Sequence, residues 1–303
     1  MKSTGKLAAL SAGTLLIGLF GELYRHVFVR GGSPLLSPLL DSKNHAADYY
    51  VHRDSAAEAL RKRRREDYAI LSSRGLSLRG YYYPGAGEGK RIAFLIHGYR
   101  SEQAETAGMF YEFYRSRGFD LFCCDHAAHG QSEGKLIGFA AVEEEDCLRW
   151  VNFLRRRFGS DVEILLHGFS MGAATVLRMA PRCPENVILV VEDSGYRSAE
   201  IQLRRQLGPL YPPLALLHRL LGIDLRKAAV LPDLQEASMP LLFVHGQSDP
   251  SVPFENGPLL YDAFPGKKDC LFLPGLRHIE TFHAAPETYG EKLDALLAGR
   301  SPI

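Results

Sequence analysis

Short apolar runs alternate with longer amphipathic segments along most of this chain. Apolar runs bounded by polar or glycine residues are typical of strands that are buried on both faces. Such runs occur at 67–73, 76–83, 91–96, 120–124, 162–167, 187–191, 241–244 and 270–273. Because only Ser-Arg-Gly separates the first two runs, this pair is predicted to be antiparallel.

The segments between these runs have the spacing of amphipathic helices. Residues 139–158 are predicted to be helical, because the acidic run 143–146 suits the positive end of a helix dipole. One apolar stripe follows this helix and comprises Val142, Cys147, Leu148, Val151 and Leu154. Further helices are predicted from Ser55 onward and near 104–117, 173–179, 256–264 and 286–297. This alternation predicts an α/β fold with a mostly parallel central sheet and helices on both faces.

One segment, at about 194–236, interrupts the alternation. It contains two helix-like pieces around 208–213 and is predicted to be a short helical lid, inserted in a single domain that spans 66–300. The lid is strongly apolar, with Leu207, Pro209, Leu210, Tyr211, Pro212, Leu214, Leu216 and Leu217. Packing onto the domain explains such a pattern, and binding of an acyl chain is the alternative.

The first 30 residues differ in kind from the rest. Lys2 and Lys6 precede an uncharged apolar stretch at 7–21, which is shorter than the roughly 20 residues that span a bilayer but reaches that length if Glu22 is tolerated near an interface. No small-residue cleavage motif ends it. We therefore interpret 1–30 as an uncleaved hydrophobic anchor that associates the protein with a membrane. A cleaved signal segment and a helix packed on the domain are the alternatives. The flanking charges do not set a membrane side, and 31–65 is predicted to be a polar lead-in.

Composition narrows the function classes. The chain has 303 residues, of which 46% are hydrophobic and 23% charged, and its net charge of +1 gives no reason to expect nucleic-acid binding. Its five cysteines show no metal-ligand spacing. Cys123 and Cys124 are neighbours on a predicted strand, so their side chains point to opposite faces and cannot readily pair. We interpret the cysteines as buried thiols. Nothing in the sequence indicates the oligomeric state.

The most informative motif is Gly168-Phe169-Ser170-Met171-Gly172. It follows a predicted buried strand and precedes a predicted helix. Strand, Gly-x-Ser-x-Gly and helix in that order form a sharp turn that presents a serine hydroxyl above a parallel sheet. Ser170 is therefore the candidate nucleophile.

A serine nucleophile needs a histidine base and a carboxylate that orients the base. Asp249 and His278 follow the last two predicted strands, so both are expected at the carboxyl edge of the sheet, where open α/β sheets bind ligands. Asp193 is the alternative acid and His283 the alternative base. We interpret Asp193 as a cap at the start of the lid and His283 as a surface residue.

The reaction also needs backbone N–H donors for the oxyanion. Met171, directly after the nucleophile, is predicted to supply one. Tyr99 is predicted to supply the second, because Gly98 lets the backbone after the strand 91–96 approach a substrate closely. His97 is interpreted as a residue that fixes this loop.

These segments carry a family resemblance over about 67–297. His97-Gly98-Tyr99, the loop from Asp125 to Gly134, Gly168–Gly172, the loop from His245 to Pro253 and Gly275–His278 together resemble the α/β-hydrolase superfamily. More narrowly, they are similar to its monoacylglycerol-lipase and serine-aminopeptidase-like branch, including bacterial hydrolases with a hydrophobic anchor and a short lid. One departure is His126, where such proteins often carry arginine.

The resemblance implies a serine hydrolase that acts on ester, thioester or amide bonds without a metal or organic cofactor. With the apolar lid, it favours a carboxylesterase or lipase-like enzyme with a small ester or acyl substrate. A peptidase or thioesterase would use the same triad, as would a haloperoxidase-like enzyme or an acyltransferase. A catalytically silent binding protein of this fold is the alternative from another class.

Overall fold

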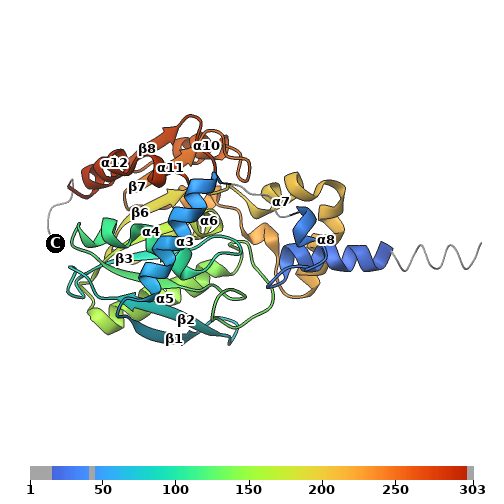
Figure 1. Ribbon diagram of the computed structural model, residues 1–303, viewed down its shortest axis with the longest axis horizontal. Helices are drawn as coiled ribbons and strands as arrows, with labels where there is room; N and C mark the ends of the chain where they lie inside the picture. Colours follow the sequence, from blue (N-terminus) through green and yellow to red (C-terminus); the bar gives the residue numbers. More distant parts are fainter. Residues whose placement is uncertain (1–15, 41–44, 299–303) are drawn as a thin grey trace, which may run out of the picture.

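The structure, a computed structural model, describes residues 16–40 and 45–298, and its centre is one eight-stranded sheet (Figure 1). The strand order across the sheet is β1-β2-β4-β3-β5-β6-β7-β8. The strands are β1 Glu66–Leu71, β2 Ser77–Tyr83, β3 Arg91–Ile96, β4 Asp120–Cys124, β5 Glu163–Phe169, β6 Val187–Asp193, β7 Leu241–Gly246 and β8 Lys268–Leu273. Each lies where an apolar run predicted a strand.

The sheet is antiparallel at one edge and parallel elsewhere. The pairs β1–β2 and β2–β4 are antiparallel, whereas every pair from β4 to β8 is parallel. The carboxyl ends of β3, β5, β6, β7 and β8 therefore meet at the same edge of the sheet. The predicted α/β class and the antiparallel first pair are both confirmed.

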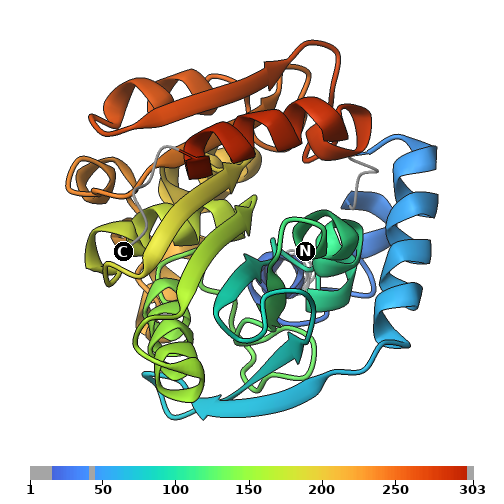
Figure 2. The ribbon, with the colours of Figure 1, turned by 90° about the vertical axis from the view of Figure 1, so that its left-hand side faces the viewer.

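Helices cover both faces of the sheet (Figure 2). On one face α5 and α6 pack beside the fully buried Trp150, and on the other α4 and α12 pack around Tyr114 and Tyr289, with α3 lying against α4. The helices outside the lid are α2 Ser37–Leu40, α3 Ala47–Arg61, α4 Gln103–Arg115, α5 Glu143–Phe158, α6 Met171–Met179, α10 Asn256–Ala263, α11 Thr281–Ala284 and α12 Pro286–Ala298. A single-turn 3-10 helix, η1, follows α6 at Ala180–Arg182.

Two helix starts differ from the prediction. The helix predicted from residue 139 begins at Glu143, because Phe139 and Ala140 have positive φ values of 54° and 71°, which an α-helix does not admit. The helix predicted from Ser55 begins earlier, at Ala47. The backbone N–H of Ala46, just before it, donates to the Glu280 carboxylate at 2.6 Å, a tertiary contact without a local sequence signal.

The lid segment contains short helices at the end of the molecule beyond the carboxyl edge of the sheet (Figure 1). They are α7 Ala199–Leu207, η2 Gly208–Leu210, α8 Tyr211–Leu220, η3 Leu225–Lys227 and α9 Leu231–Leu234. Ser198 caps α7 by accepting a hydrogen bond from the N–H of Ile201. Leu214 on α8 is fully buried, whereas Leu216 and Leu220 are exposed.

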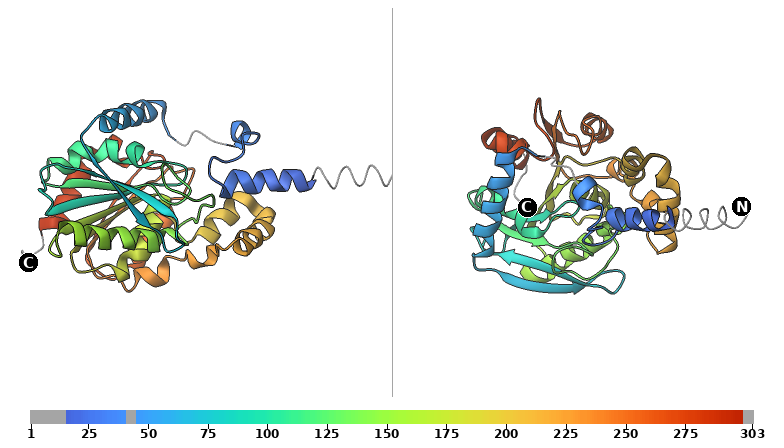
Figure 3. Two further views of the ribbon diagram at one scale, coloured as in Figure 1. Left: turned by 90° about the horizontal axis from the view of Figure 1, so that it is seen from below. Right: turned by 45° about the vertical axis from the view of Figure 1, so that its right-hand side comes forward.

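A helix over residues 16–28, called here the amino-terminal helix, lies beside α8 (Figure 3, left). Its Phe28 is fully buried, and the Tyr24 hydroxyl donates to Nδ1 of His218 on α8 at 2.9 Å. Thus residues 24–28 pack on the domain, as in one of the alternatives given for 1–30. Residues 1–15, which hold most of the predicted anchor, lie outside the described residues. Among the residues described, no helix is both long and apolar enough to cross a membrane.

All five cysteines are free thiols in this structure. Cys123, Cys124 and Cys147 are buried, while Cys183 and Cys270 are half-buried. No disulfide framework constrains the fold.

Candidate active site

Ser170 occupies the sharp turn between β5 and α6. Its φ of 55° and ψ of −111° lie outside the regions that most side chains adopt. Glycine is required on both sides, because a Cβ at Gly168 would overlap the Gly172 carbonyl, and one at Gly172 would overlap the Ile96 carbonyl on β3. The Ser170 N–H donates to the Asp193 carbonyl at 2.8 Å, which holds the turn against β6. Backbone contacts therefore impose this unusual conformation.

Asp249 and His278 come together on the loops after β7 and β8. Oδ2 of Asp249 lies 2.6 Å from Nδ1 of His278. The other carboxylate oxygen accepts the N–H groups of Ser251 at 2.8 Å and Val252 at 2.9 Å. Every oxygen of this buried carboxylate is thus engaged, and the His278 ring is oriented through Nδ1, which leaves Nε2 for a substrate or nucleophile.

The electrostatics keep the Asp249 carboxylate ionised. Burial by itself would raise its pKa, but the charge of His278 and hydrogen bonds from His245 and His278 outweigh burial and hold the pKa below its usual range. A carboxylate that stays charged at neutral pH stabilises an imidazolium beside it.

Asp193, the alternative acid, has other partners. Its carboxylate accepts hydrogen bonds from the Ser194 hydroxyl at 3.0 Å and the Tyr289 hydroxyl at 3.5 Å. Complete burial raises the pKa of Asp193 to about 6. The structure therefore brings Asp249, and not Asp193, into hydrogen-bond contact with His278.

The two other candidate histidines lie outside this constellation. Nε2 of His283, on α11, lies 3.4 Å from Asp48, and the residue lines a separate groove beside α3 and α4. His97 is completely buried: its Nε2 accepts the N–H of His126 at 3.0 Å, and its Nδ1 lies 2.8 Å from the Gly98 carbonyl. Burial holds the pKa of His97 well below its usual value, so the ring stays neutral and fixes the loop after β3.

The two predicted oxyanion donors lie on either side of Ser170. Met171 is the first residue of α6, and the first N–H groups of a helix have no partner within that helix. Tyr99 follows β3, and Gly98 before it lies so close to β5 that an added Cβ would be 3.1 Å from the Phe169 carbonyl oxygen. Both backbone segments therefore stand at the carboxyl edge beside the serine.

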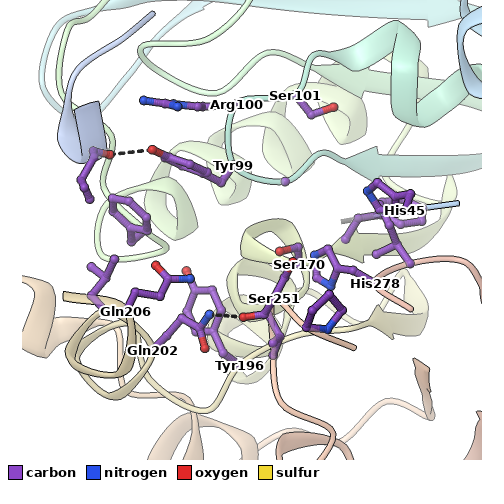
Figure 4. A pocket seen from close by; sticks show the side chains of 18 of the residues that line it. His45, Tyr99, Arg100, Ser101, Ser170, Tyr196, Gln202, Gln206, Ser251 and His278 are labelled. Carbon is purple, nitrogen blue, oxygen red and sulfur yellow. Dashed lines mark hydrogen bonds between the residues drawn. The ribbon is translucent and has the colours of Figure 1, made fainter. Parts of the chain in front are cut away.

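A cavity of about 870 Å³ contains both Ser170 and His278 in its wall. Figure 4 shows the two side chains facing this space, with Tyr99 opposite them and Gln202 and Gln206 from α7 at one side. No hydrogen bond joins the serine hydroxyl to His278 in the described structure; such contacts are often long in unliganded enzymes. The volume suits a small organic ligand.

Sequence reasoning missed the contribution of residues 45–53 to this wall. His45 stacks on Tyr49 with ring centroids 4.3 Å apart, and lies 6.1 Å from the His278 ring. Burial, and then the charge of His278, lower the pKa of His45 to about 4, so the ring is neutral. No local motif signals this role, because the contact spans more than two hundred residues of sequence.

Among the described residues, metal-ligand geometry is not found at this edge. Across residues 16–40 and 45–298, no group of three or more histidine, cysteine, aspartate or glutamate side chains is placed to hold a metal ion.

The chain resembles known proteins over most of its length. A family model for serine aminopeptidases of type S33 matches residues 87–222. An uncharacterized protein of Bacillus subtilis, YqkD, is 23% identical over 250 residues, which is 79% of this chain and 81% of that protein. Mouse monoglyceride lipase is 31% identical over 120 residues, or 38% of each chain.

Two solved structures share the fold. The Pyrococcus furiosus esterase Pf2001 superposes with a TM-score of 0.62 at 20% identity, covering 78% of this chain and 92% of the esterase. Est1E of Butyrivibrio proteoclasticus, solved with ferulic acid, gives a TM-score of 0.63 at 19% identity, covering 76% and 99%.

Proposed function

We propose that this chain, a member of the α/β-hydrolase superfamily related to its monoglyceride-lipase branch, is a serine esterase that uses Ser170, His278 and Asp249. The observation that carries the proposal is the 2.6 Å contact between Asp249 and His278, in a cavity whose wall includes Ser170. Esterases and hydrolases among proteins of the same fold support it.

In the proposed reaction, Oγ of Ser170 attacks the ester carbonyl carbon while Nε2 of His278 takes the hydroxyl proton. The carbonyl oxygen becomes an oxyanion that accepts hydrogen bonds from the N–H groups of Met171 and Tyr99. His278 then gives its proton to the departing alcohol, and an acyl-serine remains. Water, deprotonated by His278, then attacks the acyl carbon; the bond to Oγ breaks, His278 returns the proton to Oγ of Ser170, and the acid is released. Asp249 stays ionised throughout and stabilises the imidazolium.

The cavity wall favours an ester with an apolar acyl group. Apolar side chains reach it from three separate segments: Val27 of the amino-terminal helix, Phe139 before α5, and Leu203 and Leu207 of α7. A series of p-nitrophenyl esters of rising chain length tests this preference. Higher kcat/KM for medium chains than for acetate supports acyl binding, whereas hydrolysis of amide or thioester substrates alone would favour the peptidase or thioesterase alternative.

A fluorophosphonate probe tests the nucleophile itself. Labelling is expected on Ser170 and lost in Ser170→Ala, while Ser198→Ala, which removes only a helix cap, stays labelled. Labelling that persists in Ser170→Ala would remove the assignment. A wild-type protein that neither reacts with the probe nor hydrolyses any ester would favour the non-catalytic binding alternative.

Membrane association through the amino-terminal segment is a further part of the proposal. The neighbouring amino-terminal helix and lid, called here the apolar patch, both expose apolar residues: Leu16, Ile17, Leu19, Leu210, Leu216, Leu220 and Leu221. Such a patch suits an apolar environment better than water. Flotation of the full chain with phosphatidylcholine vesicles is the expected result. Loss of flotation in a Leu16→Glu/Leu220→Glu variant would assign the contact to this patch, and a wild type that stays in the soluble fraction would contradict it.

A further inference from the structure

The loop that carries the proposed oxyanion donor is tied to the amino-terminal helix. The Tyr99 hydroxyl donates to the carbonyl of Val27 at 2.9 Å and lies 3.3 Å from the carbonyl of His26. The Arg100 guanidinium donates to the same His26 carbonyl. The last carbonyl groups of a helix have no partner within it, so Tyr99 and Arg100 satisfy groups that the helix itself leaves open.

The ring of Tyr99 is also held by packing. It stacks on Phe139 with centroids 5.2 Å apart and planes 27° apart. Phe139 meets Phe28 of the amino-terminal helix at 5.7 Å, and Phe28 meets His218 of the lid at 4.5 Å. A continuous column of four rings therefore joins the loop after β3 to the helix and the lid, and such contacts favour one relative placement.

The carboxyl end of the amino-terminal helix is itself anchored to the loop between β4 and α5. The N–H of Ile137 donates to the Phe28 carbonyl at 2.9 Å, and the N–H of Arg30 donates to the Lys135 carbonyl at 2.8 Å. The Arg30 side chain adds a bond to the Ser132 carbonyl at 2.7 Å. The carbonyl groups that receive the Tyr99 hydroxyl are thus fixed to the body of the domain.

On the other side of Tyr99 the backbone is restrained as well. Arg100 has a φ of 55°, and its N–H donates to Nε2 of the buried His129 at 3.1 Å. With its side chain held by the helix and its next peptide held by His129, Tyr99 has little freedom to change the direction of its own N–H.

We infer that the amino-terminal helix positions the oxyanion hole, with the Tyr99 hydroxyl as the positioning group. The Tyr99 side chain touches neither nucleophile nor base; it fixes the direction of the backbone N–H of the same residue. The inference rests on the proposed function. It means that residues 24–30 help to position the oxyanion donor.

The first test is Tyr99→Phe, which removes one hydroxyl and keeps the ring. Because loss of an entire oxyanion donor costs roughly 10²–10³ in rate, a donor that is merely loosened should lower kcat about ten-fold. KM should change less than about two-fold, since ground-state binding does not use this hydrogen bond. Affinity for an apolar trifluoromethyl ketone, whose adduct with Ser170 places an oxyanion in the same hole, should fall by the same factor as kcat.

The matched control is Tyr82→Phe. The hydroxyl of this buried tyrosine donates to Asp120 at 2.7 Å, at the opposite end of the strands from Ser170. The Tyr82→Phe variant should be less stable than the wild type but keep the wild-type kcat. Equal losses of kcat in the two variants would show a general effect of hydroxyl removal and overturn the inference.

A second variant weakens the attachment of the amino-terminal helix and leaves Tyr99 unchanged. Arg30→Met leaves every cavity-lining side chain in place but removes a bond that anchors the helix. It should lower kcat and ketone affinity as Tyr99→Phe does, and the double variant should lose less than the product of the two factors, because both act through one contact. Should both single variants keep kcat and ketone affinity within about two-fold, the inference is wrong. A wild type in which the fluorophosphonate does not label Ser170 contradicts the proposed function instead.

Discussion

The floor and the roof of the cavity are built on different principles. The floor consists of loops that directly follow β3, β5, β7 and β8, and its polar groups are buried and hydrogen-bonded in detail, as Asp249 illustrates with contacts to His278, Ser251 and Val252. The roof comes from the amino-terminal helix, residues 45–53 and the lid, and it mixes apolar side chains such as Val27, Leu203 and Leu207 with polar ones. The register of the sheet places the floor, whereas the roof depends on packing between segments far apart in the sequence. Loss of a single polar atom in the floor should therefore lower the rate of the reaction. Changes of shape in the roof should instead alter substrate selectivity and the stability of the protein.

The largest effect is expected in the floor, from Asp249→Asn. An amide in place of the carboxylate no longer stabilises the imidazolium and favours the wrong tautomer of His278, so kcat should fall by roughly 10³–10⁴. Ester hydrolysis under saturating substrate measures it. Asp193→Asn, on the adjacent strand, should change kcat far less, because Asp193 bonds to Ser194 and Tyr289. The reverse ranking would transfer the acid role to Asp193.

The roof should show its largest effect in stability, with Phe28→Ala. Phe28 is fully buried between His218 and Phe139, and removal of such a ring costs about 3–5 kcal/mol. Urea unfolding of the full chain measures the change. Leu19→Ala, on the same helix but 47% exposed, should cost less than about 0.5 kcal/mol. Equal, small changes in both variants would mean that the amino-terminal helix does not pack on the domain in solution.

The buried carboxyl group of Glu192, on β6, gives the domain a distinctive pH dependence. Burial raises the pKa of Glu192 from 4.5 to about 7, although its carboxylate accepts the N–H of Gly195 at 2.9 Å. The folded pKa lies above the unfolded one, so this group's contribution is fully present below about pH 4.5 and is lost as the pH rises to about 7. Glu192→Gln should therefore gain stability relative to wild type between pH 4.5 and 8, by about 3 kcal/mol at most.

Urea unfolding of both proteins at the two pH values measures this difference. Glu163→Gln, a similar change at a half-exposed position at the start of β5, is the control; it gives up an ion pair with Arg91 and should therefore not gain stability at pH 8. If the wild type instead becomes more stable relative to Glu192→Gln as the pH rises, the assigned direction of the pKa shift is wrong.

The smallest effect is expected from reshaping the roof. Leu207 at the end of α7 lines the cavity, and Leu207→Trp should fill part of the space available to an acyl chain. Relative to acetate, kcat/KM for long-chain esters should drop about ten-fold, in line with the 1–3 kcal/mol that steric changes in apolar pockets usually produce. Leu220→Trp, on the 76% exposed position of α8, is the control and should leave the ratio unchanged. A parallel drop for acetate would place the effect in the chemistry rather than in chain selection.

Local signals explain why the floor was accessible to prediction. The glycines around Ser170 are needed within a few residues of it, where strand, turn and helix follow directly. Asp249 and His278 were expected at one edge because each follows a strand, and parallel strands share an edge. Their assignment as acid and base stays a prediction until the variants are measured.

The roof offered no comparable signal. The apolar stretch near the start of the chain is compatible with a bilayer, a signal segment or a protein interface, because hydrophobicity does not specify the partner. His45 and Tyr49 line the cavity, and the N–H of Ala46 between them donates to Glu280 across the fold, a contact that no local pattern signals. The helix start at Ala47 was missed for the same reason.

By itself, the sequence determined the strands, the α/β class and the serine turn, because each depends on periodicity or on neighbours in the chain. Only the tertiary structure decided that Asp249 rather than Asp193 is hydrogen-bonded to His278. It also decided that the Tyr99 hydroxyl donates a hydrogen bond to the carbonyl of Val27. These contacts depend on distances between residues that lie tens of positions apart in the sequence. Such distances are set by how the layers pack, and no local pattern encodes them.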